Sequence, residues 1–222
     1  MSEQIECVVV ETGPAPRACV VWLHGLGADG YDFVPIVKEL EQLNVPPTRF
    51  VFPHAPKIPV SINGGYVMRA WYDIRNVDLQ RQEDEQGVRN SQKTIENLIE
   101  EQIKIGFSPE QIVLAGFSQG GAIAYQAGLR GRHKLAGLIA LSTYLPCESS
   151  FNEEFKHSHA NIPVLAVHGS QDNIVLQERG EKAVALLKAK NMQVQWKTYP
   201  MAHSVCGEEV VDIADFLKSL FG

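Results

Sequence analysis

The sequence lacks the features that would direct it to nucleic acid or into a membrane. Acidic residues outnumber basic ones by 26 to 20, and the net charge of −6 is scattered rather than blocked. Because no basic patch is present to neutralise a phosphate backbone, we expect no nucleic-acid partner. No stretch approaches the roughly 20 apolar residues that span a bilayer, so we also expect no stable membrane insertion.

Cysteine is scarce, and its spacing excludes the common metal sites. The four cysteines, Cys7, Cys19, Cys147 and Cys206, include no CxxC pair. We therefore expect free thiols rather than disulfides. The first six residues lack the basic and apolar segments of a secretory signal, so the sequence predicts a cytoplasmic protein.

Internal repeats and low-complexity tracts are also absent, and 222 residues suit one domain over 1–222. Apolar runs predict the strands. They are Cys19–Leu23, Phe50–Phe52, Ile112–Ala115, Gly137–Leu141, Val164–Val167 and Val194–Tyr199. Unbroken apolar runs indicate strands buried on both faces, as in a parallel sheet. The last run alternates, which favours a place near the sheet edge, and Ile5–Val10 predicts an early edge strand.

Amphipathic stretches separate these runs and predict helices. Their apolar residues recur at helical spacing over 33–43, 88–105, 121–129, about 184–188 and 210–220. Strands that alternate with helices indicate right-handed crossovers, hence an α/β fold with a doubly wound, mostly parallel sheet flanked by helices.

One long stretch, from Pro53 to about Gln86, shows no clear period. A loop of this length in a compact domain is often functional. Its apolar residues favour a wall of the substrate site; a surface excursion with a short hairpin is the alternative.

The clearest chemical signal is Gly116-Phe117-Ser118-Gln119-Gly120, which follows a predicted strand and precedes a small-residue helix. This is the G-x-S-x-G pattern of a nucleophilic serine on a sharp strand-to-helix turn. The flanking glycines leave room for the neighbouring strand and helix. The hydroxyl of Ser118 is then presented at the carboxyl edge of the sheet, where ligands bind in open α/β sheets.

A serine hydroxyl needs a base, and seven histidines compete for that role. In folds with this turn the acid and then the histidine follow the serine along the chain. His203 meets this order, since it lies after the last strand and before the last helix. The other six histidines are less suitable. His24 and His54 lie before Ser118, and His168 lies before the acid. His133, His157 and His159 lie in predicted helix ends or loops. Asp172 follows the strand Val164–Val167 and is the predicted acid; it could also cap the next helix.

The oxyanion of an acyl-transfer reaction needs two backbone N–H donors. Gln119 follows the nucleophile, and Leu26 lies in the glycine-rich loop after the strand Cys19–Leu23, so we expect these two. His24 would then hold the loop by hydrogen bonds. Cys206 near His203 is an alternative nucleophile but no tight turn presents it. Ser142 ends a strand without flanking glycines, and we expect it to line the site or pack beneath it.

Several motifs occur together in one order. They are Trp22-Leu23-His24-Gly25-Leu26-Gly27, Pro53-His54-Ala55-Pro56, Met68-Arg69-Ala70-Trp71-Tyr72-Asp73, Gly116-Phe117-Ser118-Gln119-Gly120-Gly121, His168-Gly169-Ser170-Gln171-Asp172 and Met201-Ala202-His203-Ser204-Val205-Cys206. Over nearly the whole chain, these motifs resemble the carboxylesterase / acyl-protein thioesterase (lysophospholipase-like) family, and most of all its bacterial carboxylesterase branch.

The resemblance implies an α/β-hydrolase fold without a large cap domain, and a Ser118–His203–Asp172 triad that needs no metal or organic cofactor. It also implies that the segment from Ile62 to Trp71 borders the acyl pocket. Thr143 stands where relatives often carry glycine and would add bulk there.

The expected activity is a serine carboxylesterase for short- to medium-chain acyl esters. A thioesterase acting on long-chain acylated proteins or lysophospholipids is the alternative. A non-catalytic binding protein on the same fold is the third reading. The apolar loop over the site also leaves a weak homodimer open.

Overall fold

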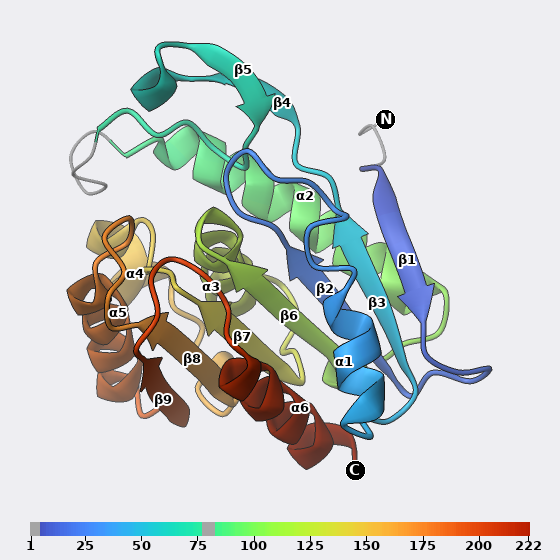
Figure 1. Ribbon diagram of the computed structural model, residues 1–222. Helices are drawn as coiled ribbons and strands as arrows, with labels where there is room; N and C mark the ends of the chain where they lie inside the picture. The colour runs from blue at the N-terminus through green and yellow to red at the C-terminus, as the bar shows by residue number, and fades with distance from the viewer. Residues whose placement is uncertain (1–4, 77–82) are drawn as a thin grey trace.

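The computed structural model describes residues 5–76 and 83–222, and seven of its strands form one sheet (Figure 1). The strand order is β1-β3-β2-β6-β7-β8-β9. The bounds are β1 Cys7–Glu11, β2 Ala18–Leu23, β3 Thr48–Pro53, β6 Ile112–Phe117, β7 Gly137–Leu141, β8 Val164–Gly169 and β9 Val194–Tyr199. β1 pairs antiparallel with β3, and the other neighbours pair parallel. The predicted strands are therefore confirmed, with β1 and β9 at the two edges.

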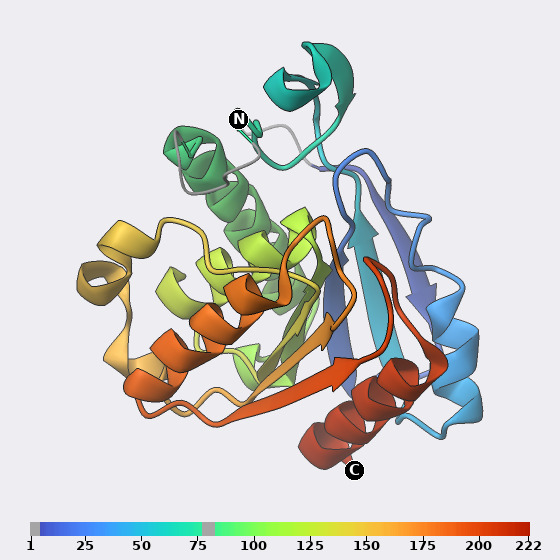
Figure 2. The same cartoon turned by 60° about the vertical axis from the view of Figure 1, so that its left-hand side comes forward.

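Helices cover both faces of this sheet, as the two views show (Figures 1 and 2). One face carries α1 (Ile36–Gln42) and α6 (Gly207–Phe221), and the other carries α2 (Glu85–Lys104), α3 (Gln119–Arg130) and α5 (Gln177–Ala189). A short α4 (Glu148–Glu154), which the sequence analysis did not predict, follows β7. These helices confirm the predicted doubly wound α/β architecture.

The alternation of side chains along the central strands divides the core into two layers. In β2, Val20 and Trp22 join the layer under α1 and α6, whereas Val21 and Leu23 join the layer under α2, α3 and α5. All four are 0% exposed. Strands buried on both faces are therefore apolar without interruption, as the sequence pattern indicated.

The stretch without a clear period contains a hairpin. β4 (Lys57–Val60) and β5 (Tyr66–Arg69) pair antiparallel in a sheet of their own, which projects beyond the body of the molecule in Figure 1. The connection is a 3₁₀ turn over Ser61–Asn63 followed by two glycines with positive φ. This part of the stretch follows the hairpin alternative. After the hairpin the chain is buried at residues 70–72, and the carbonyl of Ile74 then accepts from the backbone N–H of Ile62 in the hairpin turn at 2.8 Å. Residues 77–82 lie outside the described residues.

The carboxyl ends of β2, β6, β7 and β8 lie at one edge of the sheet, because these strands are parallel and neighbouring. The loops that follow them carry the residues predicted for the site. Among the described residues, no helix combines the length and apolar character needed to cross a membrane.

Candidate active site

Ser118 occupies the turn between β6 and α3 in a strained backbone conformation. Its φ is 54° and its ψ is −120°, a region that costs energy for any residue with a Cβ. Its backbone N–H donates to the carbonyl of Leu141 at 2.9 Å, and α3 begins at the next residue. The turn therefore projects the Ser118 side chain at the carboxyl edge of the sheet, above the start of a helix.

The glycines on either side of Ser118 are required by close packing. A Cβ on Gly116 would come within 3.0 Å of the backbone of Gly120, and a Cβ on Gly120 would come within 3.0 Å of the carbonyls of Leu23 and His24. Backbone atoms cannot rotate away as a flexible side chain can. The spacing of G-x-S-x-G thus has the steric basis expected from the sequence.

Asp172 and His203 form a short hydrogen bond beside Ser118. The His203 Nδ1 lies 2.6 Å from Asp172 Oδ2, and Asp172 Oδ1 accepts from the backbone N–H groups of Ile174 and Val175, each at 2.9 Å. Since Asp172 is 5% exposed, the carboxylate is held on both oxygens. With Nδ1 directed to Asp172, Nε2 is the nitrogen that can act on Ser118.

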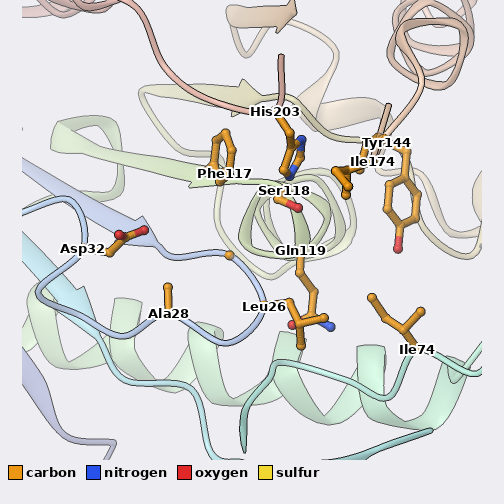
Figure 3. A pocket seen from close by; sticks show the side chains of 12 residues that line it. Leu26, Ala28, Asp32, Ile74, Phe117, Ser118, Gln119, Tyr144, Ile174 and His203 are labelled. Atoms are coloured by element: carbon orange, nitrogen blue, oxygen red, sulfur yellow. The ribbon is translucent and has the colours of Figure 1, made fainter. Parts of the chain in front are cut away.

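Ser118 and His203 line the same cavity, which has a volume of about 270 Å³. Figure 3 shows the imidazole next to the serine side chain, with the ring of Phe117 beside it. The centroids of Phe117 and His203 are 4.7 Å apart. The structure therefore brings the three residues predicted for catalysis together at one end of the sheet.

His24 fixes the loop that carries one predicted oxyanion donor. Its Nε2 accepts from the backbone N–H of Ala55 at 3.0 Å, so Nδ1 carries the proton and donates to the carbonyl of Gly25 at 2.7 Å. Burial lowers the pKa of His24, which keeps the ring neutral as this arrangement requires. These bonds confirm the interpretation of His24 as a residue that holds the loop.

Leu26 and Gln119 both line the cavity around Ser118. The side chain of Gln119 has a second, structural role that was not predicted from the sequence. Its Oε1 accepts from the backbone N–H of Trp71 at 2.8 Å, and its Nε2 donates to the carbonyl of Tyr72 at 2.7 Å. Trp71 Nε1 in turn donates to the carbonyl of His24 at 2.9 Å. A continuous set of hydrogen bonds thus joins the serine turn, the 71–72 segment and the glycine loop.

The three residues predicted to contact substrate lie outside the lining of this cavity. Ile62 is 40% exposed in the hairpin turn, and Trp71 is 2% exposed with both nitrogens bonded as described above. Thr143 is 3% exposed, and its Oγ1 donates to the carbonyl of Ser118 at 2.7 Å. Their contact with substrate stays a prediction, whereas Trp71 and Thr143 visibly brace the serine turn.

Several residues that line the cavity were not predicted from the sequence. They are Ala28, Asp32, Ile74, Phe117, Tyr144, Ile174 and Val175. Phe117 is part of the serine motif, and Ile174 and Val175 follow Asp172 closely, so position next to a motif was an available signal. Ile74 likewise follows the motif that ends at Asp73, and Tyr144 follows Thr143.

A second buried imidazole stands against Asp172. His168 Nε2 donates to the carbonyl of Val175 at 2.7 Å and lies 3.5 Å from Asp172 Oδ2. Burial lowers the pKa of His168, so the ring is neutral and serves as a hydrogen-bond donor. It thereby fixes the loop that presents both the acid and a wall of the cavity.

The alternative nucleophiles are poorly placed. Ser142 is 0% exposed and packs beneath the cavity rather than lining it. Cys206 stands at the start of α6, where burial raises the pKa of its thiol and so disfavours the reactive thiolate.

Comparison with known proteins assigns the family. The phospholipase/carboxylesterase family matches residues 5–221. Acyl-protein thioesterase 1 of Gibberella zeae is 39% identical over 98% of this chain and 96% of its own length. Acyl-protein thioesterase 1 of Cryptococcus neoformans is 34% identical over 98% of both chains. The crystal structure of Arabidopsis thaliana SOBER1 superposes with a TM-score of 0.87 at 32% identity, covering 93% of this chain and all of the other.

The chain therefore belongs to the phospholipase/carboxylesterase family of serine hydrolases and has the α/β-hydrolase fold. A further solved structure, Zea mays acyl-protein thioesterase 2, superposes with a TM-score of 0.86 at 27% identity over 98% of this chain and 99% of the other. The fungal thioesterases give no support to the expectation that the bacterial carboxylesterase branch is the nearest one.

Proposed function

We propose that the protein hydrolyses acyl thioesters and acyl oxyesters, with Ser118 as nucleophile, His203 as general base and Asp172 as the acid that orients the imidazole. One observation supports this most strongly. The 2.6 Å bond between His203 and Asp172 lies at the cavity that also contains the strained Ser118. Such an arrangement of nucleophile, base and orienting group is the general signature of covalent acyl transfer.

The reaction proceeds in two half-reactions. His203 takes the proton of Ser118 as Oγ attacks the acyl carbonyl, and the backbone N–H groups of Leu26 and Gln119 stabilise the oxyanion. The C–O or C–S bond then breaks, and the leaving alkoxide or thiolate receives the proton from His203. Water attacks the acyl-enzyme by the same steps and releases the carboxylic acid and free Ser118.

S-acylated proteins are the substrate class that the comparisons favour. The relatives named above as acyl-protein thioesterases align over almost their whole length, which supports the thioesterase alternative more than the short-chain carboxylesterase. The cavity volume of about 270 Å³ favours the carboxylesterase as the second candidate, since it lies below the roughly 300–1,000 Å³ usual for ligand pockets.

The first test is covalent labelling with a fluorophosphonate, together with turnover of an S-acyl peptide and of its O-acyl serine analogue. The wild-type protein should take the label, and Ser118→Ala should lose both the label and activity, with kcat reduced by roughly 10⁶. A higher kcat/KM for the S-acyl peptide supports the thioesterase, and a higher value for the O-acyl peptide supports the carboxylesterase. An unlabelled wild-type protein, or an active Ser118→Ala, would refute the proposal and favour a binding protein.

A further inference from the structure

The cavity has two unlike sides around Ser118 (Figure 3). On one side lie the apolar side chains of Ile74 and Ile174 together with the ring of Tyr144, and on the other lie Ala28, the ring of Phe117 and the carboxyl of Asp32. An acyl chain is apolar, so burial on the Tyr144 side is favourable and burial beside Asp32 is not. We therefore expect the acyl group of a bound ester to point towards Tyr144.

Tyr144 is hydrogen-bonded to a second tyrosine. Its hydroxyl lies 2.6 Å from the hydroxyl of Tyr72, and the two residues are 7% and 2% exposed. Burial raises the pKa of both phenols, so both keep their protons and one donates to the other. Parting the two rings would leave two buried hydroxyls without this bond, which is unfavourable.

A second cavity of about 320 Å³ lies on the other side of Tyr72. Tyr72 lines this cavity together with Pro56, Ile58, Trp71 and the first turns of α2. Its Cβ is 3.0 Å from where a Cβ on Gly87 would stand, and Gly87 lines the same cavity. The Tyr72 side chain thus extends from the second cavity to the Tyr144 hydroxyl at the wall of the first.

Buried side chains hold the backbone on both sides of this contact. Gln119 donates to the carbonyl of Tyr72, as described above. On the other side, buried Arg130 donates to the carbonyls of Pro146 and Cys147 at 3.0 and 2.9 Å, just beyond Tyr144. The pair is therefore a fixed part of the cavity wall.

We propose that the Tyr72–Tyr144 pair is a partition that sets the length of the acyl group the enzyme accepts. Acyl chains that end at Tyr144 fit the first cavity, and longer chains meet the Tyr144 ring, which the Tyr72 hydroxyl holds in place. The inference rests on the proposed hydrolase activity and adds the acyl length to it: the partition assigns short- to medium-chain acyl groups to thioester and oxyester substrates alike, in place of the long chains expected above for the thioesterase. Tyr72 is the residue to change in a test of the partition. It does not line the first cavity, so a change in acyl preference on its replacement would come from the pair and not from direct widening of that cavity.

The test is a series of p-nitrophenyl esters from butyrate through octanoate and laurate to palmitate. The wild-type protein, Tyr72→Ala and Tyr72→Phe are compared by the ratio of kcat/KM for laurate to that for butyrate. In the wild type the ratio should lie below one. Tyr72→Ala removes the ring between the cavities and should raise the ratio about tenfold or more, the effect of a methylene or two in an apolar pocket. Tyr72→Phe removes only the hydrogen bond and should raise it by a smaller factor.

Tyr125→Phe is the matched control, because Tyr125 is a buried tyrosine of α3 that lines neither cavity. It should leave the ratio unchanged. A wild-type preference for laurate, or an unchanged ratio in folded Tyr72→Ala and Tyr72→Phe, would overturn the partition. If Tyr72→Ala does not fold, Tyr72→Phe decides alone. A wild-type protein that cleaves no ester and takes no fluorophosphonate label refutes the proposed hydrolase instead, and the partition with it.

Discussion

The carboxylate of Asp172 is held on both of its oxygens. One oxygen accepts from two backbone N–H groups and the other bonds His203 Nδ1. The loop thus fixes the carboxylate, and the carboxylate fixes the imidazole. The hydrogen bond to Asp172 Oδ2 decides which nitrogen of His203 carries the proton. The proposed role of His203 as a base therefore depends on this one acceptor atom.

Asp172→Asn should therefore keep the fold and lose most of the activity. The amide group of Asn would donate to Nδ1, which moves the imidazole proton to Nε2 and leaves no base for Ser118. We expect kcat to fall by roughly 10⁴ with a much smaller change in KM, measured on p-nitrophenyl butyrate. Asp215→Asn is the control, since Asp215 is an exposed acid of α6 that pairs with Lys218. Turnover of Asp172→Asn within tenfold of the wild type would rule out this role.

Single residues were predictable where chemistry demands one residue type at one position along the chain. Ser118, Asp172 and His203 were chosen from the serine motif and the order of strands, and the structure brings them together. The Gln119 side chain and the Tyr72–Tyr144 bond were not predictable. Each joins segments far apart in sequence, and neither an amide nor a phenol has a required partner that a motif could reveal.

At the scale of elements, the approach of α3 to β2 determines where Ser118 stands. Gly120→Ala places a Cβ against the carbonyls of Leu23 and His24, so α3 must shift or the turn must deform. We expect a loss of at least about 1–3 kcal/mol in the free energy of unfolding, measured by urea denaturation, and a lower kcat.

The control for that variant is Gly207→Ala in the first turn of α6. No atom lies within 4 Å of a Cβ added there, so this change should leave stability equal or slightly higher. Equal stability of the two variants would show that the close packing around Gly120 is unimportant.

Elements were predictable where burial imposes a period. The central strands are buried on both faces and therefore read as apolar runs, and α2 buries one stripe of six residues. The hairpin β4–β5 was left as one of two alternatives because Val60 is the one buried residue of its two strands, with Tyr66 and Val67 exposed at 70% and 56%. Helix α4 was missed because it buries only Phe151, and one buried residue gives no period.

At the scale of the whole molecule, buried ionisable groups set the response of stability to pH. Burial lowers the pKa of His24, His159 and His168, and burial raises the pKa of Glu209 to about 8. Below about pH 6.5 these three histidines bind protons in the unfolded chain but not in the folded protein. Their contribution therefore makes the folded protein less stable as pH falls. Glu209 acts in the opposite sense, because the folded protein keeps a proton that the unfolded chain has released.

Glu209→Gln separates the two contributions. In the wild type, the unfolded carboxyl has the ordinary pKa of 4.5 and the folded one a pKa of about 8, so its contribution to stability falls as pH rises between these values. The slope is at most about 1.4 kcal/mol per pH unit. Glutamine does not titrate. The free energy of unfolding of Glu209→Gln, measured in urea, should therefore rise steadily relative to that of the wild type from about pH 5 to pH 8.

Glu208→Gln, in the same first turn of α6 but exposed, should show no such trend, because its carboxyl stays in water in both states. Both variants replace a carboxyl by an amide in the same turn, but Glu208→Gln also removes a negative charge near the helix N-terminus, whereas folded Glu209 carries its proton up to about pH 8. The comparison therefore uses the trend of stability with pH and not the size of the offset. A constant offset between Glu209→Gln and the wild type over this range would mean that the Glu209 carboxyl is ionised in the folded protein. The stability profile would then lack the opposing contribution that the raised pKa of Glu209 implies.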